Sequence, residues 1–187
     1  MSLTKNITFM SSALAVLAIV ALAGSASAAE LATQGNAQLA RELADFKRTA
    51  SQMRETADRL YSITPNRQLS WQTHSESLNA LKDHVNEMGQ SLAELEALKP
   101  TANETQALAI EHARPHLVSI ARNLTEAIRL VNESRTNVYW GDYGEAVNDV
   151  YAHADTLHAK VDAILDFEKA KARLETLELQ PVLMGQS

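Results

Sequence analysis

The chain has 187 residues, a formal net charge of −6 at pH 7 and no cysteine. Without cysteine it cannot form disulfides, thiolate-ligated metal sites or a covalently attached c-type haem. Its acidic charge and the lack of any basic cluster argue against binding to nucleic acid or to an anionic membrane surface, because both depend on contacts between basic side chains and phosphate groups.

The first 28 residues have the pattern of a signal peptide. Lys5 supplies a positive charge, the run ALAVLAIVALA is apolar, and the small residues Ala26 and Ala28 match the pattern that signal peptidase cleaves. We therefore expect cleavage before Ala29 and a periplasmic or secreted mature protein, residues 29–187. The alternative is an uncleaved signal anchor, although this apolar run is shorter than the roughly 20 residues of a comfortable membrane span. No later segment of the sequence is apolar enough to cross a bilayer.

The rest of the chain has the composition and periodicity of four long helices. Apolar residues recur at alternating spacings of three and four, which places them along one face of each helix. The predicted helices cover residues 37–63, 67–98, 102–138 and 143–178. Their apolar stripes are Leu39, Leu43, Phe46, Ala50, Met53, Ala57 and Leu60; Leu78, Leu81, Val85, Met88, Leu92 and Leu95; Ile110, Ala113, Leu117, Ile120, Leu124, Ala127 and Val131; and Val147, Val150, Ala154, Leu157, Val161 and Ile164.

Proline and polar residues mark the expected ends of these helices. The sequence TPN at 64–66 ends the first, and Pro100 ends the second. The sequence TANE, Thr101–Glu104, matches a capping box that would begin the third helix. Asp142 is the predicted N-cap of the fourth helix, and Pro181 lies just past its expected end.

Each apolar stripe is narrow, so each helix needs neighbours to bury its hydrophobic face. Short connections make consecutive helices antiparallel, which predicts a single all-α domain, an up-down-up-down four-helix bundle. The alternative is an elongated coiled-coil dimer of hairpins, because the same spacing also suits intermolecular seams.

The segment EHARPH carries the metal-binding pattern most visible in the sequence. His112 and His116 are four residues apart, so both imidazoles could reach one ion from one face of a helix. Pro115 between them should bend the helix without ending it. A zinc site usually has three or four protein ligands, and no partner motif is visible. With His112 expected toward solvent and His116 at the flank of the stripe, we expect no cofactor and treat metal binding by this pair as the alternative.

Haem binding is a second alternative that the histidines raise. His74 is the only histidine on an apolar stripe, and the sequence predicts a buried, hydrogen-bonded structural role for it. His84 and His158 flank their stripes, whereas an axial haem ligand has to point inward. The predicted architecture resembles that of cytochrome b562-type bundles in helix arrangement alone, and no residue of that family is carried over.

The large amphipathic aromatics gather at one end of the predicted bundle. Both Trp and all four Tyr lie near the first or the third connection. These two connections share an end in an up-down bundle. Such rings can close the end as a plug, or they can form a recognition surface, since Tyr, Trp and Arg dominate binding hot spots. The predicted partner-binding residues are Tyr61, Trp71, Tyr139, Trp140, Tyr143 and Arg135.

No catalytic constellation is visible, because the sequence lacks a Gly-rich phosphate loop, a nucleophile elbow and any assignable Ser/His/Asp set. We therefore expect an exported, non-enzymatic helical-bundle protein that serves as a binding or structural component of the bacterial envelope. Its expected partner is a protein, an envelope component or a second copy of the chain. The alternative function is a metal- or haem-binding bundle that uses histidines.

Overall fold

The computed structural model describes the backbone of residues 28–136, 138 and 141–184, and the side chains of 36–136, 138 and 141–177. Residues 1–27 of the predicted signal peptide, together with Tyr139 and Trp140, lie outside these described residues. The described chain is all-helical and contains no strand. Its elements are α1 (Ala28–Ile63), α2 (Trp71–Leu98), the short 3₁₀ helix η1 (Lys99–Thr101), α3 (Glu104–Glu133) and α4 (Asp142–Met184).

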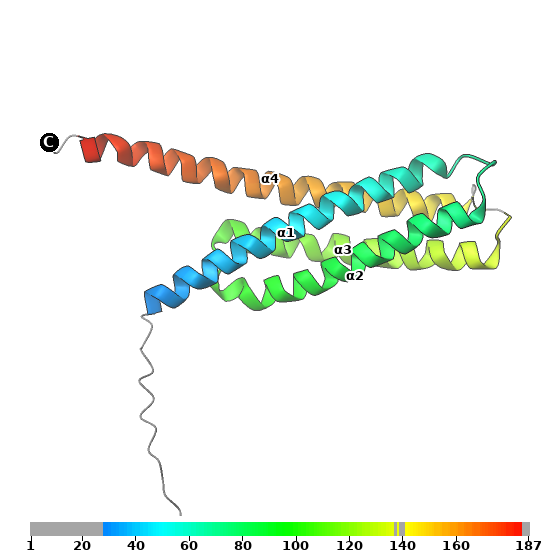
Figure 1. The fold of residues 1–187 in the computed structure, drawn as a ribbon, viewed down its shortest axis with the longest axis horizontal. Helices are drawn as coiled ribbons and strands as arrows, with labels where there is room; N and C mark the ends of the chain where they lie inside the picture. The colour runs from blue at the N-terminus through cyan, green and yellow to red at the C-terminus, as the bar shows by residue number, and fades with distance from the viewer. Residues whose placement is uncertain (1–27, 137, 139–140, 185–187) are drawn as a thin grey trace, which may run out of the picture.

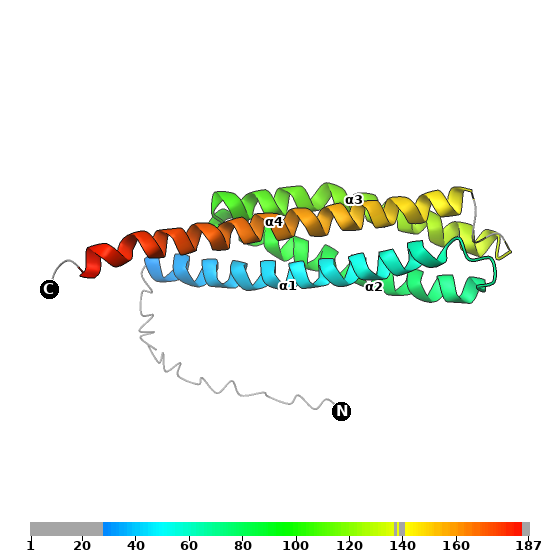
Figure 2. The ribbon, with the colours of Figure 1, turned by 90° about the horizontal axis from the view of Figure 1, so that it is seen from above.

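The four α-helices lie lengthwise beside one another. α1 and α3 each pack against both α2 and α4, and the two ribbon views show this side-by-side arrangement (Figures 1 and 2). At one end of the molecule α1 and α3 finish while α2 and α4 begin; we call this the loop end. At the opposite end, η1 leads from α2 to α3, and α4 continues beyond it (Figure 1).

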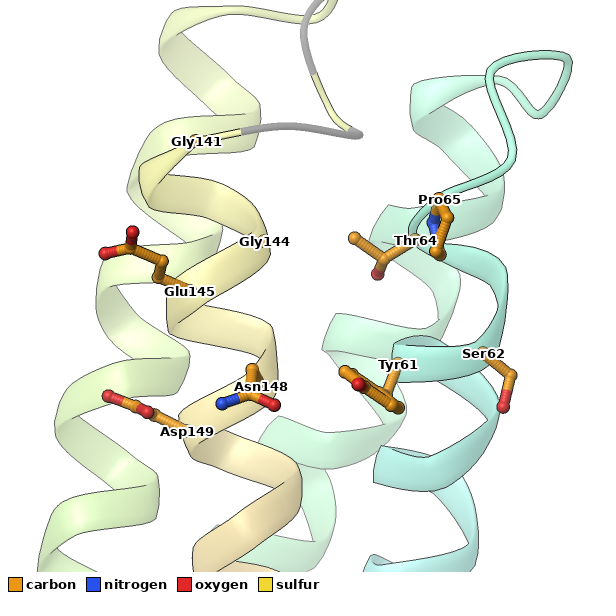
Figure 3. A pocket seen from close by; sticks show the side chains of 9 residues that line it. All are labelled: Tyr61, Ser62, Thr64, Pro65, Gly141, Gly144, Glu145, Asn148 and Asp149. Atoms are coloured by element: carbon orange, nitrogen blue, oxygen red, sulfur yellow. The ribbon is translucent and has the colours of Figure 1, made fainter.

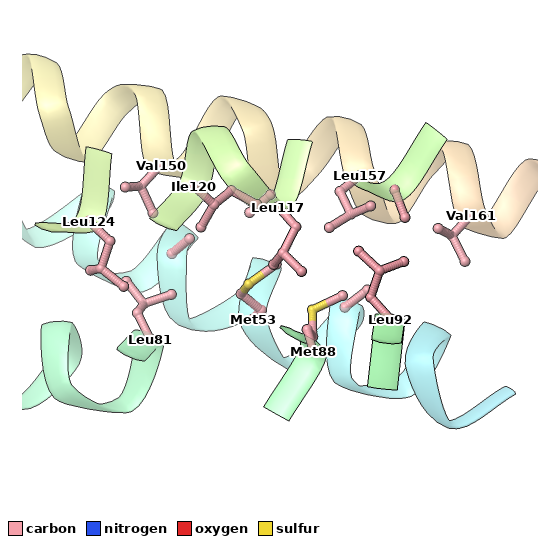
Figure 4. Packing of buried hydrophobic residues seen from close by; sticks show 14 of the residues in the cluster. Met53, Leu81, Met88, Leu92, Leu117, Ile120, Leu124, Val150, Leu157 and Val161 are labelled. Carbon is pink, nitrogen blue, oxygen red and sulfur yellow. The ribbon is translucent and has the colours of Figure 1, made fainter. Parts of the chain in front are cut away.

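The apolar stripes predicted from the sequence meet in one core, which confirms their assignment. Of the predicted stripe residues, all are buried except Val85 and Ile164, which are half-buried and pack against the core. Figure 4 shows side chains from the four helices interdigitating, with Met53 and Met88 among the leucines, isoleucines and valines. The flexible methionine side chains fill irregular space between these branched residues.

The start of α3 differs from the predicted capping box by two residues. Asn103 is the N-cap: its side chain accepts from the backbone N–H of Gln106 at 2.9 Å, and the Gln106 side chain accepts from the N–H of Asn103 at 3.0 Å. Thr101 instead donates its hydroxyl to the carbonyl of Leu98, at 2.8 Å. The difference arises because η1 uses Thr101 to end the preceding segment, so the reciprocal cap forms later in the chain.

Three other helix ends also differ from prediction. α2 begins at Trp71 and not at residue 67, because the Asn66 side chain accepts from the N–H of Gln68 and holds this stretch in a turn. α3 ends at Glu133, since Ser134 leaves the helical conformation with φ −139° and ψ 80°. α4 begins at Asp142 itself, after Gly141 with φ +64°, so Asp142 lies within the helix and does not precede it.

Pro115 leaves its helix continuous, as predicted, whereas Pro181 does not end α4 as expected. α3 is a single helix from Glu104 to Glu133 with Pro115 inside it, which confirms that this proline does not start a new helix. α4 runs to Met184, so Pro181 does not end it. α1 likewise starts earlier than predicted, at Ala28. A proline removes one N–H donor, and packing of the remaining residues can hold the helical path through it.

The third stripe provides a test of this core. Leu124→Ala should lower the free energy of unfolding by about 2–5 kcal/mol, because Leu124 is only 3% exposed and its truncation leaves a cavity. Leu108→Ala, on the same helix but 43% exposed, should change it by less than about 0.5 kcal/mol. Urea unfolding followed by circular dichroism measures both values. Equal effects of the two substitutions would contradict the assigned face of α3.

Candidate binding site at the loop end

The loop end does contain the described aromatics, but the structure divides them among three separate environments. Tyr143 lies in the interior, Trp71 lies on the α2–α3 side with Arg135, and Tyr61 lies on the α1–α4 side. The sequence grouped these residues as one partner-binding set because it could locate them only along the bundle axis. Tyr139 and Trp140 lie outside the described residues, so their predicted role stays a prediction.

Tyr143 and His74 form a buried polar pair between the starts of α4 and α2. The His74 Nδ1 lies 2.9 Å from the Tyr143 hydroxyl, and the two rings meet edge to face with centroids 5.6 Å apart. Tyr143 is 3% exposed, so its ring lies in the interior and not on the surface to which sequence reasoning assigned it. The buried, hydrogen-bonded role predicted for His74 is confirmed.

Burial keeps both members of this pair uncharged. It raises the pKa of Tyr143 well above that of an exposed phenol, and it lowers the pKa of His74 below 6.5. The His74 Nε2 is buried and has no hydrogen-bond partner among the described residues. The Tyr143 hydroxyl is therefore the partner on which the buried imidazole depends.

Trp71 and Arg135 contact each other across the α2–α3 side of the loop end. The Arg135 guanidinium lies over the Trp71 ring, 4.3 Å from the ring centroid, in a cation–π arrangement. Trp71 is half-buried and packs against the core. The pair therefore covers the edge of the core, and Arg135 occupies the face of Trp71 on which an external cation could otherwise bind.

A cleft at the loop end lies between the end of α1 and the start of α4. It encloses about 850 Å³ and is lined by Tyr61, Ser62, Thr64, Pro65, Gly141, Gly144, Glu145, Asn148 and Asp149. Figure 3 shows Tyr61 and Asn148 between the two helices, and Glu145 and Asp149 on the side of α4 that faces away from α1. Open space lies beside Gly141 and Gly144 on the α4 side of the cleft. A Cβ added at either glycine would have no neighbouring atom within 4 Å.

The lining combines a supported aromatic ring with unpaired carboxylates. Tyr61 stacks on Tyr151 of α4, with centroids 5.1 Å apart and ring planes 7° apart, yet 42% of Tyr61 stays exposed. Glu145 and Asp149 are exposed, one helical turn apart, and neither pairs with a basic side chain in the described part of the chain. Such a surface suits a ligand that carries a positive charge.

The histidines are arranged differently from the EHARPH interpretation. His112 is exposed and His116 is half-buried, as expected. However, the close partner of His116 is His153 of α4: the two Nδ1 atoms are 3.4 Å apart and the ring centroids 5.7 Å apart. Burial, followed by Lys160, His153 and His112, lowers the pKa of His116. Sequence reasoning missed His153, although antiparallel helices place it at a height similar to that of His116.

His84 takes no part in the His116–His153 pair. His84 lies 3.5 Å from the Thr56 hydroxyl, on the α1–α2 side. As the side chains stand, no three His, Cys, Asp or Glu residues converge on one metal position within the described residues. A site with more than two ligands would therefore need a side chain to rotate.

No family model, curated protein or solved structure matches this chain. A candidate function therefore has to be inferred from the side chains and their arrangement. Across the described ranges, no helix combines the length and apolarity that a bilayer crossing requires.

The His74–Tyr143 pair allows the structural role of Tyr143 to be measured. Tyr143→Phe should lower the free energy of unfolding by about 1–3 kcal/mol, because it removes the one hydrogen-bond partner that the described residues give to a buried imidazole. Tyr61→Phe, which removes the same hydroxyl from an exposed ring, should change it by less than about 0.5 kcal/mol. Chemical denaturation at pH 7.5 makes the comparison. If Tyr143→Phe left the free energy of unfolding unchanged, the pair would not be contributing to the stability of the fold.

Proposed function

We propose that this chain is an exported, non-enzymatic protein that binds a partner at its loop end. In this proposal a signal peptide, residues 1–28, is removed, and the mature chain 29–187 works in the periplasm or outside the cell as an up-down-up-down four-helix bundle. The side-by-side packing of α1 to α4 supports the bundle (Figures 1 and 2). The small residues before Ala29 support the cleavage.

The observation that carries the binding function is the α1–α4 cleft. A cleft of about 850 Å³ that is not filled by side chains contributes nothing to closing the bundle end. Interior closure is instead provided by the Tyr143–His74 pair. The two interpretations of the aromatics therefore apply to different residues: Tyr143 serves as the plug, and Tyr61 serves the binding surface.

The cleft suits a protein partner that presents a Lys or Arg side chain on an extended segment. Its cation can lie against the exposed face of Tyr61. A second basic group on the same segment can pair with Glu145 or Asp149, which are exposed on the side of α4 that faces away from α1. The net charge of −6 favours the approach of such a partner over long range.

Self-association is the alternative partner proposal. Phe167, Leu174 and Leu177 on α4 are each about 60% exposed. Their spacing of seven and three residues places them on one face, beyond the part of α4 that packs in the core. An apolar stripe of this kind suits a second helix.

Metal or haem carriage is the alternative function. The observation that favours a metal is the approach of His116 to His153, because imidazole is a common ligand of transition metals. For haem, the buried histidine among the described residues is His74, whose Nδ1 contacts Tyr143 and whose Nε2 has no hydrogen-bond partner there.

Export predicts a defined N-terminus. Mass spectrometry of the protein from the producing cell's envelope fraction should show a chain that begins at Ala29. Ala28→Phe should block this processing, because signal peptidase requires a small residue immediately before the cut. An intact Met1 on a membrane-bound species, unchanged by Ala28→Phe, would contradict export by cleavage.

The cleft predicts binding of a basic peptide. A Lys- and Arg-rich hexapeptide, titrated calorimetrically at low salt, should bind the wild type, and the double variant Glu145→Gln, Asp149→Asn should weaken this binding by at least about tenfold. That factor corresponds to roughly 1.4 kcal/mol, within the range expected for two charge-assisted contacts. Tyr61→Ala should weaken binding as well, through loss of the cation–π contact.

The control for that experiment is a double variant with the same charge change elsewhere. Asp83→Asn, Glu94→Gln removes two exposed carboxylates of α2 that do not line the cleft. If this control weakens peptide binding as much as the cleft variant does, the attraction is a general effect of the acidic surface. That outcome would remove the support for a loop-end site.

A further inference from the structure

The His116–His153 pair has the spacing of two ligands on one tetrahedral zinc ion. Zinc–imidazole bonds of about 2.0–2.1 Å at the tetrahedral angle place the two nitrogens roughly 3.3–3.4 Å apart. The observed Nδ1–Nδ1 distance is 3.4 Å. With their ring centroids 5.7 Å apart, the two nitrogens face each other almost directly, so each ring has to turn before both lone pairs meet on one ion.

The core holds the two imidazoles in this relation. Each histidine adjoins a fully packed residue in the chain, His116 next to Leu117 and His153 next to Ala154, both of which are buried. α3 and α4 pack closely along their length, so the two backbones cannot separate without opening the core. Both imidazoles are half-buried, so each keeps part of its surface in contact with water. A metal could therefore enter without movement of either helix.

A third ligand is available one helical turn away. His112 precedes His116 by four residues on α3 and is exposed, so its side chain can rotate toward the pair without leaving a cavity. Glu111 is less available, because it is paired with Lys99 across the α2–α3 end. Lys160 is the positive group that acts on His116, but its side chain is exposed and its charge is screened at physiological salt.

We propose that His116 and His153, joined by His112, bind one Zn²⁺ between α3 and α4, with water in the remaining position. The site lies on the flank of the helices and shares no residue with the loop-end cleft, so it does not depend on the proposed partner binding. Because a zinc site of this type links two helices, the ion would stabilise their packing. The open position also leaves the ion accessible for exchange or delivery.

The test is a Zn²⁺ titration of the protein, purified without a histidine tag and cleared of metal with a chelator. Calorimetry at pH 7.5 should show one equivalent bound, and Zn²⁺ should raise the melting temperature. Loss of a mere outer-shell partner typically weakens metal affinity by 10–100-fold. Replacement of a ligand, in His116→Ala or His153→Ala, should therefore weaken binding by at least about tenfold. His112→Ala should cause a smaller loss.

The matched control is the double variant His84→Ala, His158→Ala, which removes two half-buried histidines with other surroundings. His84 lies beside Thr56 of α1, and His158 acts on Asp162, the partner of Lys47. It should bind Zn²⁺ like the wild type. Circular dichroism confirms folding of each variant, and His153→Gln provides a less disruptive substitution if His153→Ala unfolds. The proposal is overturned if the wild type shows no saturable binding, if the control loses as much affinity as the pair variants, or if His153→Ala and His153→Gln bind normally. The last result together with a loss in His112→Ala would assign any binding to His112 and His116 alone.

Discussion

The mutual burial of four apolar stripes is the constraint on which every other feature depends. Each stripe is too narrow for its helix to remain stable alone in water, so helix formation and helix packing are coupled. The core is continuous from Leu39 near one end to Val138 near the other. Because close-packed interiors resist sliding, this continuity fixes the height and rotation of the surface residues beside the core on α1 to α4.

The loop end shows how that constraint distributes chemistry. Rotation of α4 turns Tyr143 inward against His74, and one further turn and a half along the same helix Asn148 faces Tyr61 (Figure 3). The interior pair closes the end of the core, while the α1–α4 cleft stays open beside it. This acidic chain thus combines a closed core with an accessible aromatic and carboxylate surface within a few helical turns and without a cysteine.

The His116–His153 pair depends on the same rigidity in a different way. Surface histidines on two separate, flexible elements would lose much conformational entropy on binding one ion. Here the packing of α3 on α4 sets the distance between the imidazoles before any metal arrives. Because this distance is already set, His116 and His153 are stronger candidates for zinc ligands than His112 and His116 alone.

The sequence by itself determined the helical class, the four stripes and the buried position of His74, because these follow from the 3.6-residue period of the helix and the cost of exposing apolar surface. The sequence located the aromatic residues along the bundle axis, but it did not show which side of the bundle each one faces. The cap at Asn103 was missed because two overlapping patterns competed within four residues. Only the tertiary structure decided that His116 meets His153, that Tyr143 is interior and that Tyr61 borders a cleft. Those outcomes depend on the rotation and register between helices, which arise from the packing of the whole core and have no local signature in the chain.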